Sequence, residues 1–163
     1  FALFFTFFVF QKDSFIQKEF VEKITKGRLI NWEIGLKGWL EKPLLGFGPE
    51  NYELIFPKYY NPCLAVSECG SETWFDRSHN IIIDALVSSG IFGLISYLMI
   101  FFSAFWLLWK KSNQDKMTKG FFSIILICYF LQNLTVFDMI NSYLIFFLIL
   151  GFISAQKHLT FNN

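Results

Sequence analysis

A long apolar stretch without any charged residue, Ile91–Trp109, constrains this chain more than any other feature. A helix needs roughly 20 consecutive apolar residues to cross a bilayer, and this stretch is long enough. The chain of 163 residues is 54% apolar and contains 23 Phe. A soluble domain of this length lacks the interior volume to bury so much phenylalanine. We therefore predict a membrane protein whose solvent is largely lipid.

Further apolar segments lie on both sides of this stretch. We predict an all-α polytopic membrane protein, built as a partial helix bundle with a large external loop that contains amphipathic helices. The short segment Lys110–Lys119 carries four lysines against one aspartate, and positive charge in a short loop marks the cytoplasmic side. The expected segments are the end of a transmembrane helix whose beginning lies upstream (1–10), a periplasmic loop (11–78), a long transmembrane helix (79–109), a cytoplasmic loop (110–119), two further transmembrane helices (120–137 and 141–156) and a cytoplasmic tail (157–163).

Net charge and the missing motifs exclude several classes of function. The net charge of +1 provides no basic field for nucleic acid. The chain has no phosphate-binding glycine-rich loop, no dinucleotide fingerprint, no nucleophile elbow and no D-x-D motif, so we predict neither a cofactor nor a metal. The two histidines, His79 and His158, fall on opposite sides of the membrane in this topology. Cys63 and Cys69 can pair if their loop is periplasmic, whereas Cys128 is interpreted as an inert packing residue.

The external loop contains an amphipathic helix followed by a turn. Between Gly27 and Glu41 large apolar residues recur every three or four positions, which predicts a helix with one buried side; they are Leu29, Trp32, Leu36, Trp39 and Leu40. Glu33, Lys37 and Glu41 are spaced four apart on the other face and can form ion pairs. Pro43 ends this helix, and the sequence Gly46-Phe47-Gly48-Pro49 predicts a turn.

The segment Asp76–Asn80 is the strongest candidate for chemistry. We expect Ser78 to cap a helix that starts near His79. A helix N-terminus carries free backbone N–H groups and a partial positive charge, so Arg77 and His79 at this place suit a phosphate or diphosphate. The alternative is that both residues are interfacial anchors.

Other candidates lie nearby in the sequence. Arg28 shares the apolar side of its helix, where a guanidinium needs an anionic partner or extends to lipid headgroups. Asp84 suits either a solvated entrance or a partner for Arg28 or Arg77. Gly46 and Gly48 either bring backbone close to a ligand or form a simple turn. Asp138 is either a buried functional acid or a loop residue.

The order of these features resembles the conserved domain of the O-antigen ligase family. The resemblance covers roughly Gly27 to Leu94, and it is carried by motifs in the family's order and spacing: Gly27-Arg28, Trp32, Pro43 with Gly46-Phe47-Gly48, Ser78-His79-Asn80, and Gly90-Ile91-Phe92-Gly93. Ser88 departs from the pattern, since many members carry Glu there. That departure puts a role for an acid at this position in doubt.

The resemblance implies a multi-pass protein of the bacterial inner membrane with its active loop in the periplasm. It implies a glycosyltransferase that moves a glycan from undecaprenyl diphosphate to a saccharide acceptor such as lipid A-core, in lipopolysaccharide or surface polysaccharide biosynthesis, without a metal. Arg28 and His79 take the family's essential positions and are expected to be catalytic. We expect Arg77, Asn80, Asp84, Gly46 and Gly48 to contact the diphosphate or the acceptor.

Three alternatives remain open from the sequence. Within the same superfamily, the chain is a polysaccharide polymerase or a protein O-oligosaccharyltransferase. From a different class, it is a non-catalytic transport or assembly subunit of the membrane. Only the enzymes depend on Arg28 and His79 and on an undecaprenyl-linked donor.

Overall fold

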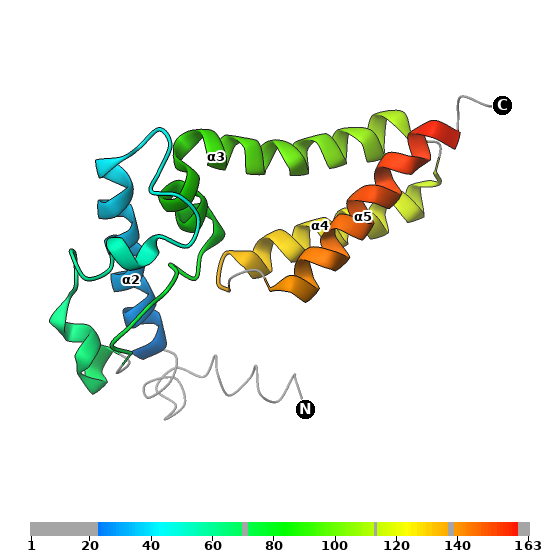
Figure 1. The fold of residues 1–163 in the computed structure, drawn as a ribbon. Coiled ribbons are helices and arrows are strands. Elements are labelled where there is room, and N and C mark those ends of the chain that lie inside the picture. Colours follow the sequence, from blue (N-terminus) through cyan, green and yellow to red (C-terminus); the bar gives the residue numbers. More distant parts are fainter. Residues whose placement is uncertain (1–22, 70–71, 113, 137–138, 160–163) are drawn as a thin grey trace, which may run out of the picture.

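The computed structural model describes residues 23–69, 72–112, 114–136 and 139–159, and every regular element within these residues is helical. The predicted transmembrane end at 1–10 and Asp138 lie outside the described residues. Figure 1 shows α2 (Lys23–Glu41) and the irregular loop after it at one end of the molecule. Three long helices extend from there, namely α3 (Ile81–Trp106), α4 (Lys116–Asn133) and α5 (Ile140–Leu159). The prediction of an all-α fold is confirmed for the described part of the chain.

Helix α2 buries its glycines together with Asn31 and Ile34, and it leaves its three leucines exposed. The buried positions are spaced three or four apart and form one stripe; they are Gly27, Asn31, Ile34, Gly35 and Gly38. The expected buried side was therefore only partly right, because Trp32 and Trp39 are partly buried while Leu36 and Leu40 are 41% and 67% exposed. The loop that follows α2 packs so closely against this stripe that a Cβ on Gly38 would lie 2.3 Å from Cγ2 of Ile55.

The charged face of α2 follows the prediction in part. Lys37 and Glu33 form the expected ion pair at 2.7 Å. Glu41 instead accepts a hydrogen bond from Lys58 Nζ at 2.6 Å and from the Tyr59 hydroxyl at 2.5 Å. Hydrogen bonding to Lys58 lowers the pKa of Glu41 and raises that of Lys58. These contacts attach the end of α2 to the loop that follows it.

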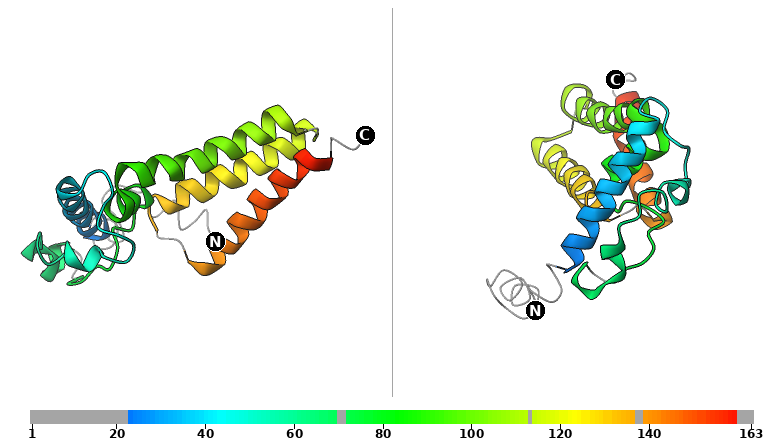
Figure 2. Two further views of the ribbon diagram at one scale, coloured as in Figure 1. Left: turned by 45° about the horizontal axis from the view of Figure 1, so that its top comes forward. Right: turned by 90° about the vertical axis from the view of Figure 1, so that its left-hand side faces the viewer.

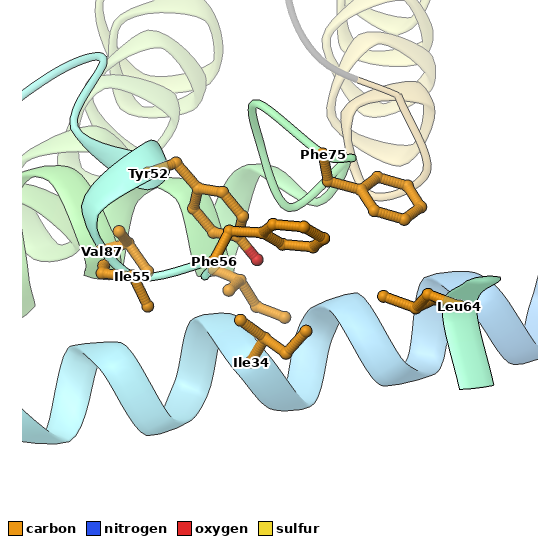
Figure 3. Close-up of a cluster of buried hydrophobic side chains, with 8 residues drawn as sticks. Ile34, Tyr52, Ile55, Phe56, Leu64, Phe75 and Val87 are labelled. Atoms are coloured by element: carbon orange, nitrogen blue, oxygen red, sulfur yellow. The ribbon is translucent and has the colours of Figure 1, made fainter. Parts of the chain in front are cut away.

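The loop folds around a core of its own, centred on Phe56. Figure 3 shows this cluster, in which Ile34 of α2 faces apolar side chains of the loop and of α3. Phe56 is 1% exposed, and its ring centroid lies 5.5 Å from that of Trp74 and 5.9 Å from that of Phe75. Burial of these rings provides the apolar area that holds an irregular chain in one conformation.

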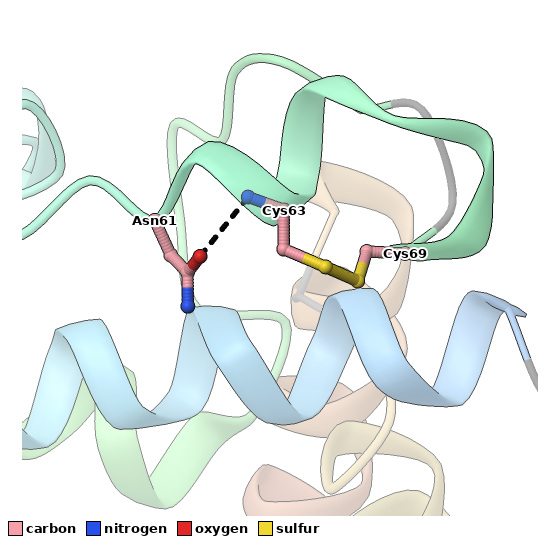
Figure 4. The surroundings of a disulfide bond; sticks show 3 residues. All are labelled: Asn61, Cys63 and Cys69. Carbon is pink, nitrogen blue, oxygen red and sulfur yellow. Dashed lines mark hydrogen bonds between the residues drawn. A yellow bond between two sulfur atoms is a disulfide. The ribbon is translucent and has the colours of Figure 1, made fainter.

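A disulfide bond closes the far end of this loop. Cys63 and Cys69 are bonded, which joins the short helices Pro62–Ala65 and Ser67–Cys69. Figure 4 shows the bond beside Asn61, whose side chain accepts a hydrogen bond from the Cys63 amide at 3.0 Å. The carbonyl of Cys69 lies against Gly27, where a Cβ would be 2.8 Å from its oxygen. The disulfide loop is therefore packed on the first turns of α2, next to Arg28.

Removing this disulfide is expected to loosen the loop. Replacing both Cys63 and Cys69 with Ser should lower the free energy of unfolding by about 2 kcal/mol, because the closed loop is short and the constraint on the unfolded chain is small. Thermal unfolding of the purified protein, with and without reductant, measures this effect. Cys128→Ser is the matched control, since Cys128 is a free, exposed thiol. A double variant that still responds to reductant as the parent does would contradict the assignment.

Helix α3 is broken at Gly90. This residue has φ 66° and ψ −164° inside an otherwise helical run, a conformation that is essentially restricted to glycine. The sequence predicted one continuous helix over 79–109, whereas the break separates a first part packed beside α2 from a second, apolar part. The reason is that the turn after α2 occupies the space beside Gly90. A Cβ there would lie 2.2 Å from the Leu44 carbonyl oxygen.

Backbone hydrogen bonds connect the break to the predicted turn at 43–48. The amides of Phe47 and Gly48 donate to the carbonyls of Val87 and Ser88, both at 2.8 Å, and the Ile91 amide donates to the Pro43 carbonyl at 2.9 Å. An interrupted helix leaves backbone amides and carbonyls at the break without partners inside the helix, and here the turn supplies these partners. The two glycine motifs of the sequence therefore form one structural unit, which we call the glycine clip (residues 43–48 and 87–91).

The three long helices pack through aromatic side chains. Figure 2 shows α4 returning alongside α3, and α5 running back in turn. Their core contains Phe101, Leu126 and Phe146, with the rings of Tyr129 and Phe146 stacked at 4.4 Å. Helix α3 continues into a π-helical turn (Leu107–Lys111). Within the described residues, Ile81–Lys110 is long and apolar enough to cross a membrane, and Ile140–Ala155 is a shorter apolar helix.

Candidate functional site

The segment Asp76–Asn80 is attached to α2 by a fully buried asparagine. Asn31 is 0% exposed and its Nδ2 donates to the Arg77 carbonyl at 2.8 Å. The Tyr52 hydroxyl lies 2.7 Å from Asn31 Oδ1 and 2.9 Å from the Asn31 carbonyl, so its single proton serves one of the two. Burial, with a smaller contribution from the charge of Asp84, raises the pKa of Tyr52. The hydroxyl therefore stays protonated and remains a donor.

His79 lies directly after this attachment, in an unusual backbone conformation. Its φ is 57°, a value that is uncommon outside glycine and that concentrates at functional sites. Nδ1 lies 3.2 Å from the Arg77 carbonyl oxygen, and the ring meets Phe75 edge-on with centroids 5.6 Å apart. Because a carbonyl oxygen can only accept, this contact places the proton of a neutral ring on Nδ1. Nε2 then carries the lone pair.

Ser78 does not cap α3, which corrects the expectation. The helix begins at Ile81, and the capping side chain is that of Asn80, which accepts hydrogen bonds from the amides of Ile82 and Ile83. Ser78 is instead fully buried. Its amide and its hydroxyl lie 2.8 Å and 2.6 Å from Oδ1 of Asp84. Asp84 therefore holds the segment in place through Ser78, and its carboxylate also interacts electrostatically with Arg77.

Asn80 also connects the segment to the helix bundle. While its Oδ1 caps α3, its Nδ2 donates to the Leu134 carbonyl at 3.1 Å, at the end of α4. An asparagine side chain can make both contacts because it carries an acceptor and a donor. The segment is therefore fixed on one side by α2 and on the other by the α4–α5 connection.

A pocket of about 290 Å³ opens next to this segment. Its wall combines the loop, α3 and α5, and the residues with polar side chains or aromatic rings include Glu50, Asp76, Arg77, Asp84, Tyr97 and Tyr143. Gly48 of the glycine clip also lines it. Three of the residues predicted for the site, Arg77, Asp84 and Gly48, are therefore brought together around one cavity. His79, Asn80, Arg28 and Gly46 are not part of its wall.

The two arginines have different surroundings. The guanidinium of Arg77 forms an ion pair with Glu50, whose backbone has φ 60°. Arg28 is half-buried and stands three residues before Asn31 on α2, which is less than one helical turn. Within the described residues no hydrogen bond or ion pair of Arg28 is found. The helix that carries Arg28 thus meets the segment that carries His79 through the Asn31–Arg77 bond.

Gly46 has a structural role in the clip. With φ 68°, a Cβ at this position would lie 2.5 Å from the Val87 carbonyl oxygen. Its backbone approaches α3 and its amide donates to the Lys42 carbonyl at 2.9 Å, as the turn alternative from the sequence predicts. No group of three His, Cys, Asp or Glu side chains that could hold a metal ion occurs in the described residues.

Sequence reasoning missed several residues that build this site. Asn31 and Tyr52 act through partners far away in the chain, and Tyr143 reaches the pocket from α5. For Asn31 the sequence offered one signal, namely a polar residue within the predicted helix, three positions after Arg28. The structure shows that this position is buried. Tyr143 had no local signal, because a tyrosine at the start of an apolar segment is expected at a membrane interface.

Comparison with known families decides where this architecture belongs. A family model described as O-antigen ligase matches residues 1–98, which is more than half of the chain. The chain belongs to the O-antigen ligase family. The region that matches the O-antigen ligases contains α2, the disulfide loop, the segment Asp76–Asn80 and the glycine clip. No curated protein and no solved structure matches the chain. Members of the O-antigen ligase family are glycosyltransferase-like membrane proteins of polysaccharide biosynthesis.

Proposed function

We propose that the protein is a membrane glycosyltransferase that moves a glycan from undecaprenyl diphosphate to a saccharide acceptor, in the manner of an O-antigen ligase. The observation that carries this proposal is the convergence of Asn31 and His79 on the carbonyl of Arg77. This convergence attaches α2, the helix that carries Arg28, to the segment that carries His79. The same segment holds the imidazole of His79 in a strained and oriented conformation. Membership of the O-antigen ligase family supplies the reaction class.

His79 acts as the general base in this proposal. A hydroxyl oxygen of the acceptor attacks the anomeric carbon of the donor glycan and gives its proton to Nε2 of His79. The bond between that carbon and the phosphate oxygen breaks, and undecaprenyl diphosphate leaves with the bonding electrons. The Nδ1 contact with the Arg77 carbonyl supports this role, because it orients the ring and stabilises the imidazolium that forms. A single displacement inverts the anomeric centre.

Arg28 stabilises the leaving diphosphate. Negative charge develops on the phosphate oxygens as the bond breaks, and a guanidinium can bind two of these oxygens at once. Among the described residues, Arg28 forms no ion pair with which a diphosphate would have to compete. The fixed positive charge makes added divalent metal unnecessary in this reaction.

The loop that carries the site faces the periplasm of a bacterial inner membrane in this proposal. The disulfide between Cys63 and Cys69 supports that orientation, since disulfides persist in oxidising compartments. The lysine-rich connection between α3 and α4 then lies in the cytoplasm, as its charge favours. The segments 120–137 and 141–156 follow as further spans of a polytopic protein.

Substitution of the two proposed catalytic residues tests the function. Reconstituted protein is supplied with an undecaprenyl-diphosphate-linked glycan and lipid A-core, without added metal, and the glycosylated product is measured. We expect Arg28→Ala and His79→Ala each to lower the rate by roughly 100-fold or more, because a charge partner and a general base are removed.

Matched controls separate this result from a loss of folding. Lys37→Ala changes an exposed cation on the same helix, and His158→Ala changes the other histidine. Both should transfer at the parental rate, and all four variants should unfold at similar temperatures. Parental activity in Arg28→Ala and His79→Ala would refute the proposed function.

A further inference from the structure

The pocket beside the segment Asp76–Asn80 has the wrong charge for a diphosphate. Its wall contains three carboxylates, from Glu50, Asp76 and Asp84, and one guanidinium, from Arg77. Arg77 is already paired with Glu50, so its charge is balanced within the wall. The two remaining carboxylates would repel the phosphate oxygens of a lipid diphosphate at short range.

The same wall suits the hydroxyl groups of a sugar. Carboxylates accept hydrogen bonds from hydroxyls, and Ser89 and Tyr143 add hydroxyl groups to the wall. The hydroxyl of Ser88 donates to the Asp84 carbonyl at 2.7 Å and can still accept a hydrogen bond. Tyr97 and Tyr143 add aromatic surface, on which the C–H groups of a sugar ring can pack. The volume of about 290 Å³ is at the lower end of small-molecule sites, roughly 300–1,000 Å³. A site of this size fits the terminal sugar of a longer glycan.

We propose that this pocket binds the terminal sugar of the acceptor saccharide, whereas the donor diphosphate binds outside it, on the side of Arg28. This inference rests on the proposed function and divides the site into two halves. Asp76 and Arg77 line the pocket, and His79 follows two residues after Arg77. An acceptor hydroxyl at the mouth of the pocket therefore lies next to the segment that carries the base.

Steady-state kinetics, in which the concentration of each substrate is varied in turn, test whether the acceptor and the donor bind in separate halves of the site. Asp76→Asn removes one wall carboxylate and Tyr143→Phe removes one wall hydroxyl. With the reconstituted protein, we expect Asp76→Asn to raise the KM for lipid A-core roughly 10- to 100-fold, because a hydrogen bond to a charged group is lost. Tyr143→Phe should raise it by a smaller factor. The KM for the undecaprenyl-diphosphate glycan should not change in either variant.

Two controls carry the same chemical changes outside the pocket. Glu53→Gln removes an exposed carboxylate from the short helix Tyr52–Leu54, and Tyr60→Phe removes a hydroxyl from the neighbouring loop. Neither residue lines the cavity, so both variants should keep the parental KM for both substrates.

The outcomes distinguish the two proposals. If the pocket held the diphosphate instead, Asp76→Asn would remove a repulsive charge and lower the KM for the donor. That result, or an unchanged KM for lipid A-core in both variants, would overturn the inference while transfer itself continues. If the parent protein transfers nothing to lipid A-core, the proposed ligase function fails, and direct binding of undecaprenyl diphosphate then tests the division of the site. Binding that is unchanged in Asp76→Asn but lost in Arg28→Ala would support the division, whereas binding that is tighter in Asp76→Asn or unchanged in Arg28→Ala would overturn it.

Discussion

Replacing Gly90 with alanine is expected to lower the free energy of unfolding by about 3–6 kcal/mol. The residue sits at φ 66° and ψ −164°, where any side chain costs roughly 1–3 kcal/mol of backbone strain. The new Cβ would also lie 2.2 Å from the Leu44 carbonyl oxygen. Relief of that clash moves the turn away from α3 and weakens the three hydrogen bonds of the glycine clip, each worth about 0.5–1.5 kcal/mol.

The long helices provide matched glycines for comparison. A Cβ added at Gly120 in α4 or at Gly151 in α5 would meet nothing within 4 Å. Alanine at these positions should leave stability unchanged or raise it by up to about 1 kcal/mol, because alanine favours the helix. Thermal unfolding in detergent, followed by tryptophan fluorescence, compares the three variants. If Gly90→Ala melts at the same temperature as Gly120→Ala, the clip does not hold α3 in its broken form.

Replacing Asn31 with leucine is expected to lower the free energy of unfolding by about 1–3 kcal/mol and to reduce activity strongly. Leucine has a similar size but cannot form hydrogen bonds, so the Arg77 carbonyl is left with the contact with His79, and the Tyr52 hydroxyl is left with the backbone carbonyl of residue 31. Each hydrogen bond that is lost contributes about 0.5–1.5 kcal/mol. The segment before α3 is then released, and the orientation of His79 is lost with it.

A double-mutant cycle with Tyr52→Phe identifies the origin of this cost. Tyr52→Phe alone removes the donor and keeps the ring in the core. If the two residues act through their mutual bond, the double variant should be less destabilised than the sum of the two single variants. Strict additivity would show that Asn31 stabilises the fold without Tyr52. Glycan transfer by folded Asn31→Leu at the parental rate would show that the anchoring of the segment does not matter for catalysis.

Local patterns in the sequence predicted a good part of this architecture. The helical character, the end of α2 before Pro43, the turn at Gly46–Pro49 and the helix after the Asp76–Asn80 segment all follow from residues that are neighbours in the chain. Proline and glycine act locally, so their effects can be read without a partner. The open possibility that Cys63 and Cys69 pair is also realised.

What the sequence could not predict depends on pairs of distant residues. The break at Gly90 lies in an uninterrupted helical pattern, and it arises because a turn more than forty residues earlier in the chain packs against it. The buried face of α2 was misassigned for a similar reason. Close packing against Ile55 and the Cys69 carbonyl selects glycines at the contact, and it leaves the leucines outside. Asn80 took the capping role from Ser78 because the Ser78 hydroxyl is engaged by Asp84.

The position of Tyr143 has a consequence for how members of such a family can diverge. The matched region ends at residue 98, yet the cavity is completed by a side chain from α5. Most residues of the pocket wall lie within the matched region, and Tyr143 joins them from outside it. If the pocket receives the acceptor as proposed, a substitution at this one position can change which recipient is accepted without altering the surroundings of Arg28 and His79.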